Sequence, residues 1–319
     1  MFHLRAIKEV EGVTITAVAD RDRTRMESVK AKSGAERGYL DYLELLSDPD
    51  VEAVVINTPP RLHEEMVVRL LKAGRHVLCE KPLARSVEGC LKIRRIQAET
   101  GLVVLPGHNY AFTPCLDRAR ELIRSGAVGE VRGVSVRFEN SLRSYGSKTG
   151  FRLETEFGII EDILPHILSA TLGLGGTAET VVKVRGWRES YDVVDNMSLT
   201  LGTDRGAEID CSMSWTRLIP RFEVNITGTS GRIEMDLMRS PFTVTVESGG
   251  ERRKINERSG LRQYLDLVRF KHPSFQSQYR HLCRLVEGAE EPRITIDDEI
   301  AMIRVMEEVV KRLSETNIS

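Results

Sequence analysis

The sequence predicts an α/β protein of two domains, residues 1–112 and residues 113–319. In the first part, apolar runs of strand length alternate with stretches of helix length, which is typical of βαβ units in a parallel, doubly wound sheet. In the second part, short alternating runs follow one another closely, which indicates an α+β domain with a large, mainly antiparallel sheet. The length of 319 residues and a hydrophobic content of 41% suffice for two cores.

The elements expected in the first domain form three strand-and-helix pairs and one further strand. Each strand is a β-branched or apolar run, and the helix after the second strand places its apolar side chains on one face. The strands are expected at Val13–Ala19, Glu52–Ile56, His76–Lys81 and Leu102–Leu105, and the helices end near Gly34, Ala73 and Glu99.

The second domain is expected to begin with a helix that has proline in its first turn and glycine at its end. The helices are expected at Pro114–Ser125, Pro165–Leu172, Ser274–Glu287 and Asp297–Ser314. The strands are expected at Val131–Glu139, Thr180–Trp187, Met197–Leu201, Ala207–Trp215, Phe222–Thr227, Arg232–Leu237 and Thr243–Glu247.

Composition excludes several classes of function. The 46 basic and 47 acidic residues leave a formal net charge of −1, so no overall field attracts nucleic acid or an anionic membrane. No stretch reaches the roughly 20 apolar residues of a spanning helix. Five cysteines without a CxxC pair favour a reducing cytoplasm, and neither a metal signature nor a GxSxG motif is present. A small-molecule partner is expected.

The tripeptide Glu80, Lys81, Pro82 is the strongest chemical feature of the sequence. It closes an apolar run that is expected to form a central parallel strand, and open α/β sheets bind their ligands at the carboxyl ends of strands. An ammonium group at this position can hold an alcohol or alkoxide oxygen by a charge-assisted hydrogen bond. The alternative is an ordinary solvated surface lysine.

Two other strand ends carry candidate cofactor residues. Asp20 can accept ribose hydroxyls of an adenine dinucleotide, which favours NAD, whereas Arg21 beside it suits the 2′-phosphate of NADP. Asp20 could instead be a helix cap. The loop from Asn57 to Pro60, followed by His63, either packs beneath the cofactor or is a proline-stiffened turn.

Asp162 and His166 stand four residues apart at the expected start of a helix, where they share one face. An imidazole can take a hydroxyl proton near neutral pH and return it in the reverse reaction. The alternative is an acidic residue at a helix N-terminus and a histidine in the core. Pro165 between them is tolerable only if the helix has barely begun.

These motifs, in this order, make the chain resemble the glucose-fructose oxidoreductase, inositol dehydrogenase and rhizopine-catabolism family (Gfo/Idh/MocA). The likeness covers nearly the whole chain. It rests on Asp20, the Asn57–Pro60 loop, Glu80–Pro82, Gly107–Tyr110, the pair Asp162 and His166, the run Val194–Asn196, the segment Ile226–Ile233 and the closing helix after Ile294 and Thr295.

The resemblance implies a Rossmann domain that binds NAD or NADP, and hydride transfer at a hydroxyl of a sugar, cyclitol or sugar derivative. It implies contact of Lys81 with substrate and nicotinamide, and binding of substrate by Asp162 and His166, with His166 as acid or base. It places Thr58, Pro59, His63, Glu80 and Asn109 along the cofactor site. It also implies a homodimer or homotetramer formed through the C-terminal sheet.

The chain departs from the family at its beginning. Phe2 to Ile7 match the first family helix, but the strand and glycine-rich loop that precede it are absent. We therefore expect Met1 to be an internal methionine of a parent longer by about 15 residues, with a short form of rearranged sheet as the alternative. In addition, Leu164 stands where relatives often have glycine, so an altered pocket is expected.

Two other functions stay open from the sequence. One is a sensor or scaffold of the same fold without turnover, which loss of the glycine-rich loop favours and retention of Lys81, Asp162 and His166 opposes. The other is cleavage of glycosidic bonds by transient oxidation with the same cofactor.

Overall fold

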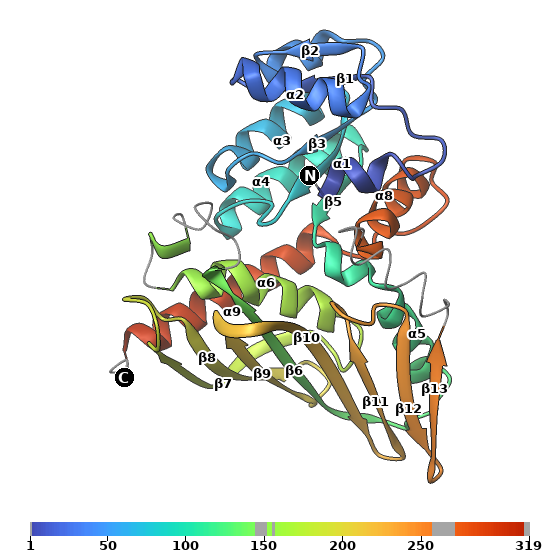
Figure 1. Ribbon diagram of the computed structural model, residues 1–319, viewed down its shortest axis with the longest axis vertical. Coiled ribbons are helices and arrows are strands. Elements are labelled where there is room, and N and C mark those ends of the chain that lie inside the picture. The colour runs from blue at the N-terminus through green and yellow to red at the C-terminus, as the bar shows by residue number, and fades with distance from the viewer. Residues whose placement is uncertain (1, 144–151, 155–156, 257–271, 316–319) are drawn as a thin grey trace. The chain divides into compact units, whose positions relative to one another are not determined.

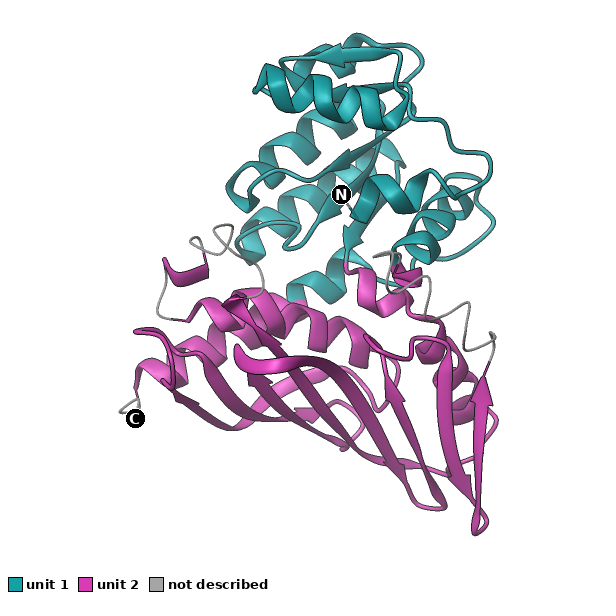
Figure 2. Cartoon of the chain, viewed as in Figure 1, with its two compact units in different colours: residues 1–107, 275–300 teal, residues 108–274, 301–319 magenta. Residues whose placement is uncertain are grey.

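The computed structural model describes residues 2–143, 152–154, 157–256 and 272–315 (Figure 1). The chain forms two compact units, which Figure 2 colours separately. The first unit contains residues 1–107 and 275–300, and the second contains residues 108–274 and 301–319. The division between domains that is expected from the sequence lies between residues 112 and 113. In the described residues, no helix is long and apolar enough to cross a membrane.

The first unit is built from parallel strands with helices between them. Its elements are α1 (Phe2–Ile7), β1 (Ala17–Ala19), α2 (Arg23–Ser33), β2 (Arg37–Tyr39), η1 (Tyr42–Ser47), β3 (Ala53–Ile56), η2 (Pro60–Leu62), α3 (His63–Lys72), β4 (His76–Glu80), α4 (Val87–Thr100) and β5 (Val104–Gly107), joined by most of α8 (Pro273–Val286). The core surrounds β4, in which Val77, Leu78 and Cys79 are fully buried.

The parallel strands form two sheets, of order β1-β2 and β3-β4-β5. In the register of the second sheet, Val55 lies opposite Leu78, and Leu78 lies opposite Leu105. β1 and β3 do not pair with each other in the described part of the chain. The break falls where the family resemblance expects an additional central strand.

The second unit consists of one eight-stranded sheet with helices along it (Figure 1). The strand order is β13-β12-β11-β10-β6-β9-β8-β7, and every pairing is antiparallel except the parallel pair of β6 and β9. The strands are β6 (Val131–Ser141), β7 (Ala178–Trp187), β8 (Asn196–Thr203), β9 (Glu208–Ser214), β10 (Thr216–Gly228), β11 (Gly231–Asp236), β12 (Thr243–Ser248) and β13 (Glu251–Asn256). The helices are η3 (Asn109–Phe112), α5 (Pro114–Arg124), α6 (Gly158–Thr171) and most of α9 (Ile296–Ser314).

Alternate side chains of the sheet strands build the core of this unit. In β6, Val134, Val136 and Phe138 are buried, whereas Ser135 and Arg137 between them are exposed, as the two-residue period of a strand requires. Figure 1 shows α6 along one face of this sheet. The expected fold class, a parallel N-terminal sheet and a mainly antiparallel C-terminal sheet, is confirmed.

Three local expectations are corrected by the structure. The first expected strand is reduced to β1, and no local pattern indicates β2 or β13, the latter because its exposed charged side chains lack an apolar alternation. The third correction concerns α6, which begins at Gly158 rather than near Pro165. Pro165 therefore lies inside the helix, where it cannot donate a hydrogen bond to the carbonyl of Glu161. Burial of Ile159 and Ile160 extends the helix in the N-terminal direction.

Candidate functional site

Lys81 follows the last residue of β4, at the carboxyl end of the three-stranded parallel sheet. Its two sequence neighbours are each anchored by a histidine of the first unit. Glu80 accepts a hydrogen bond from His3 at 2.8 Å, and the carbonyl of Pro82 lies 2.7 Å from Nδ1 of His63. The Lys81–Pro82 peptide bond is cis. The two hydrogen bonds, to Glu80 and to the Pro82 carbonyl, hold the backbone on both sides of the lysine.

The anchor on Glu80 extends to helix α8. Nδ1 of His3 lies 2.8 Å from the hydroxyl of Tyr279, and Nε2 of His3 lies 2.8 Å from Oε1 of Glu80. A neutral imidazole satisfies both partners, because Tyr279 donates to Nδ1 and Nε2–H donates to the carboxylate. The other oxygen, Oε2, accepts the backbone N–H of Lys81 at 3.2 Å. Burial raises the pKa of Tyr279 well above its ordinary range, so its hydroxyl keeps its proton.

Glu80 is ionised in this arrangement. Burial opposes the charge, but the hydrogen bonds from His3 and from the backbone N–H of Lys81, together with the positive charge of Lys81, outweigh it, so the pKa of Glu80 lies below its ordinary value of 4.5. A negative charge therefore sits directly before Lys81. No pattern in the sequence indicates that His3 and Tyr279 belong to this network, because the two residues are 276 positions apart.

The loop after β3 is tied to the same region through His63. The His63 side chain is fully buried, and its Nε2 lies 2.7 Å from the carbonyl oxygen of Thr58. The Thr58 hydroxyl lies 3.4 Å from the sulfur of Met66. Pro59 precedes the short helix η2 with an extended backbone. Because its two ring nitrogens contact the carbonyl oxygens of Thr58 and Pro82, the buried His63 side chain links the loop after β3 to the loop after β4.

Asp20 directly follows β1, as expected, and its side chain is 33% exposed. Its oxygens contact the backbone N–H of Asp22 at 2.9 Å and Nε of Arg25 at 3.2 Å. The residue that caps α2 is Asp22, which accepts the N–H of Arg25, so the helix-cap alternative for Asp20 is not what the structure shows. Arg21 is exposed.

Asp162 and His166 belong to the second unit, on helix α6. Eleven of the fourteen residues of this helix are buried, and the three that are not are Glu161, Asp162 and His166. The two candidate residues, four apart, therefore lie on the one strip of the helix that the fold leaves open.

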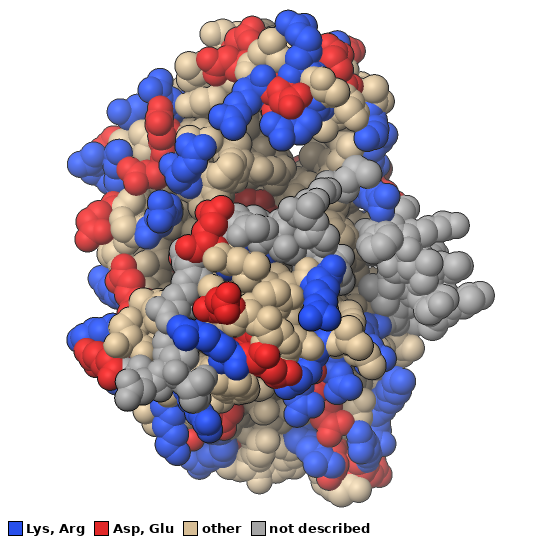
Figure 3. All heavy atoms as spheres, turned by 60° about the vertical axis from the view of Figure 1, so that its left-hand side comes forward, with Lys and Arg blue, Asp and Glu red and all other residues tan. Residues whose placement is uncertain are grey.

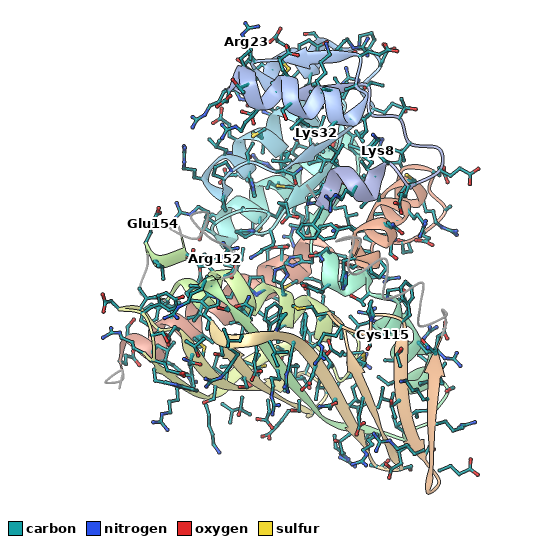
Figure 4. The ribbon with its side chains drawn as sticks, viewed as in Figure 1. Lys8, Arg23, Lys32, Cys115, Arg152 and Glu154 are labelled. Carbon is teal, nitrogen blue, oxygen red and sulfur yellow. The ribbon has the colours of Figure 1, made fainter. Side chains whose placement is uncertain are left out.

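The Asp162 carboxylate is held by two side chains and is only 14% exposed. Nε of Arg152, labelled in Figure 4, lies 3.0 Å from Oδ1, and Nε1 of Trp215 donates to Oδ2 at 3.3 Å. The imidazole of His166 packs edge-on against Tyr110 at 5.1 Å and parallel to Phe138 at 6.0 Å between ring centres. These contacts fix the direction of both groups.

Asn109, also in the second unit, is buried and donates to the hydroxyl of Ser274 at 3.0 Å. Thus the structure brings together Thr58, Pro59, His63, Glu80 and Lys81 in the first unit, and Asp162 with His166 in the second. Among the described residues, no group of three or more His, Cys, Asp or Glu side chains could hold a metal ion.

Gly107 is required at the end of β5 because it lies against β4. A Cβ atom at this position would stand 2.6 Å from Cα of Glu80 and 2.7 Å from the carbonyl oxygen of Cys79. We expect Gly107→Ala to lower the free energy of unfolding by about 1–3 kcal/mol, because backbone of β4 must move. Urea denaturation measures the change. Gly133→Ala is the control, since its Cβ would meet only Glu208 O at 3.7 Å, and equal losses in both variants would contradict the prediction.

The lowered pKa of Glu80 predicts a pH dependence of stability. The ionised carboxylate stabilises the fold fully above the ordinary value of 4.5, and this contribution is lost as the pH falls through the lower pKa of the folded state. The urea midpoint should therefore fall less on acidification in Glu80→Gln than in the unmodified protein. Glu88→Gln, at an exposed position of α4, serves as the control and should follow the unmodified protein. An unchanged acid slope in Glu80→Gln would refute the assignment.

The chain is similar to known proteins along most of its length. Residues 1–108 match the oxidoreductase family with an NAD-binding Rossmann fold, and residues 116–234 match the GFO/IDH/MocA C-terminal domain. D-xylose 1-dehydrogenase (NADP(+)) 2 of Haloferax volcanii is 26% identical over 297 residues, which cover 92% of this chain and 87% of that protein. An uncharacterized oxidoreductase of Rhizobium meliloti is 37% identical over 124 residues, which cover 39% of this chain and only 37% of that protein.

A solved structure shares the fold. The crystal structure of an oxidoreductase from Agrobacterium radiobacter, in complex with NAD+, L-tartaric acid and magnesium, superposes with a TM-score of 0.83 at 22% identity, covering 98% of this chain and 92% of that one. The two family models match both parts of the chain. The chain therefore belongs to the GFO/IDH/MocA family of oxidoreductases.

Proposed function

We propose that the protein is an NAD(P)-dependent dehydrogenase that transfers a hydride between the nicotinamide cofactor and a hydroxyl-bearing carbon of a sugar, cyclitol or sugar derivative. Sugar and inositol dehydrogenases are both among the proteins similar to this chain. The observation that carries the proposal is the anchoring of Lys81, whose neighbours Glu80 and Pro82 are each bound by a histidine.

The residues at the strand ends of the first unit fit a nicotinamide dinucleotide. Asp20 supplies carboxylate oxygens for ribose hydroxyls, Thr58 supplies a hydroxyl, and Lys81 supplies a cation, all within two residues of the end of a parallel strand. When bound, the cofactor would accept the hydride from the substrate carbon or return it. Glu80 keeps a negative charge next to the Lys81 ammonium group.

The remaining roles fall to residues of this chain that act on the substrate hydroxyl. In the proposal, His166 takes the hydroxyl proton in the oxidation and returns it in the reduction. Lys81 holds the same oxygen and stabilises the charge that develops on it. Asp162, held by Arg152 and Trp215, orients the substrate or the imidazole. Leu164 is fully buried, so its replacement of the usual glycine adds volume to the core.

Lys81→Ala tests the proposal directly. We expect kcat on a proven substrate to fall by about 10²–10³-fold, because one charge-assisted hydrogen bond to the developing oxyanion is lost. Lys72→Ala, at the last residue of α3, is the matched control and should keep its turnover. Steady-state kinetics with both variants gives the answer. Undiminished turnover in Lys81→Ala would remove this residue from the mechanism, and absence of turnover with any polyol in the unmodified protein would favour a sensor.

Asp20 underlies a proposed preference for NAD. A carboxylate accepts hydrogen bonds from ribose hydroxyls but repels the 2′-phosphate of NADP, although Arg25, which now pairs with it, could also bind that phosphate. We expect Asp20→Ser to raise the affinity for NADPH relative to NADH by about tenfold in fluorescence titrations. Asp22→Ser removes a neighbouring carboxylate that caps α2 and should leave the ratio unchanged. A ratio unchanged in Asp20→Ser would rule out this role.

A homodimer or homotetramer through the large sheet is also proposed. A shallow depression of about 540 Å³ lies on the exposed face of β6, β7, β8 and β9. The small side chains of Ser135, Ser198 and Ser212 line it, together with the basic side chains of Lys183 and Arg185. We expect the double substitution Lys183→Glu, Arg185→Glu to produce monomers in light-scattering chromatography, since it reverses two charges on this face. Lys72→Glu is the control. A single mass shared by all three proteins would contradict the interface.

The proposed location is the cytoplasm, because all five cysteines are free thiols and four of them are buried. On the face drawn in Figure 3, basic and acidic side chains are interspersed, which fits a small-molecule partner rather than a polyanion.

A further inference from the structure

His63 differs from His3, His76, His272 and His281 in the partners of its ring. Its Nδ1 lies 2.7 Å from the carbonyl oxygen of Pro82, and its Nε2 lies 2.7 Å from the carbonyl oxygen of Thr58. A carbonyl oxygen can only accept a hydrogen bond, so each of these contacts requires an N–H on the ring. A neutral imidazole has one N–H, and only the imidazolium has two.

The orientation of the ring is not in question. Turning it by 180° would place carbon atoms of the ring against both carbonyl oxygens, which would lose both hydrogen bonds. The side chain is fully buried, so water cannot replace either partner. A neutral ring would therefore set a nitrogen lone pair against a carbonyl oxygen at 2.7 Å, without any donor between them.

Each of these four other histidines has one ring nitrogen that accepts a hydrogen bond from a backbone N–H or lies next to a hydroxyl group, which can donate one. Nδ1 of His76 accepts the N–H of Val103 at 3.0 Å, and Nε2 of His281 accepts the N–H of Arg293 at 3.1 Å. Nδ1 of His3 faces the Tyr279 hydroxyl, and Nδ1 of His272 faces the Ser274 hydroxyl. A neutral ring satisfies each of them. Burial lowers the pKa of His272 to about 4 and also lowers the pKa of His76, which agrees with this assignment.

We propose that His63 is held as the doubly protonated imidazolium, which donates to Thr58 and to Pro82 at once, and that it is thereby a positioning residue for Lys81. The two carbonyls follow neighbouring strands, β3 and β4, so the cation ties together the two loops that carry Thr58 and Lys81. The part of the proposal that concerns Lys81 rests on the proposed function, whereas the protonation state does not.

Burial and position oppose the charge on the ring, and the two hydrogen bonds favour it. His63 is the first residue of α3, where the helix dipole disfavours a cation, and no described carboxylate is paired with it. Glu64 is engaged with Lys92 at 2.8 Å, and Glu80 is engaged with His3. The charged side chains on η2, α3, α4 and the segment from Glu80 to Arg85 are Arg61, Glu64, Glu65, Arg69, Lys72, Glu80, Lys81, Arg85, Glu88, Lys92, Arg94, Arg95 and Glu99. The charge-assisted bonds to two fixed carbonyls are therefore what holds the second proton.

The protonation state is measurable without any ligand. In a protein labelled with ¹⁵N-histidine, spectra that correlate ring nitrogens with ring protons distinguish bare from protonated nitrogens. We expect both nitrogens of His63 to be protonated at neutral pH, while His76 shows one bare nitrogen. A bare nitrogen on His63 would overturn the proposal. His63→Gln assigns the signal, and replacement of the other histidines one at a time assigns it by elimination if that variant does not fold.

The positioning role is tested by NADH binding across pH. A ring with one proton fewer would leave one of the two carbonyls without a donor, so NADH affinity is measured from about pH 6 to about pH 9. We expect NADH affinity of the unmodified protein to fall by about tenfold over this range, equivalent to one charge-assisted hydrogen bond. His63→Gln should bind NADH weakly and without this pH dependence, and His76→Gln, at the opposite end of β4, should follow the unmodified protein.

The outcomes separate the two proposals. A pH profile of His63→Gln that matches the unmodified protein would overturn the positioning role, even with a doubly protonated ring. If no form binds NADH or NADPH, the proposed function fails and the positioning role fails with it, while the nitrogen spectra still decide the protonation of His63.

Discussion

A lysine side chain is long and flexible, so its position in a site depends on how firmly its backbone is held. In this protein the backbone around Lys81 is fixed by hydrogen bonds to both neighbours and by close packing of β5 against β4. Glu80 is bound by His3, and the Pro82 carbonyl is bound by His63. At Gly107, β5 lies so close to β4 that no side chain fits between the two strands. Each of these contacts comes from a different element, so the fold of the first unit as a whole determines where the lysine stands.

The second unit applies a comparable constraint to the other candidate residues. Helix α6 is buried almost all round, with Asp162 and His166 among its three residues that are not. A buried helix cannot rotate without disturbing its packing, so these two side chains have one direction available. Arg152 and Trp215 then hold the carboxylate, and Tyr110 packs against the imidazole. The polar groups of both units are thus fixed by contacts outside the candidate residues themselves.

Much of the fold was predictable because its signals are local. Apolar runs of strand length marked β3, β4 and β5, and proline or glycine marked the ends of α5. The strand β13 was missed because its side chains are charged and exposed, and its position depends on pairing with β12. The early start of α6 was missed because a proline inside a helix is a strong local signal against it, which burial of the preceding isoleucines overrides.

The sequence by itself determined the two kinds of sheet, the place of Lys81 at a strand end and the four-residue spacing of Asp162 and His166, because all of these follow from periodicity along the chain. Only the tertiary structure decided which groups hold them. His3 and Tyr279 are 276 residues apart, and the two carbonyls that flank His63 come from different loops. Hydrogen bonds between distant segments depend on how the elements pack, which no local pattern encodes.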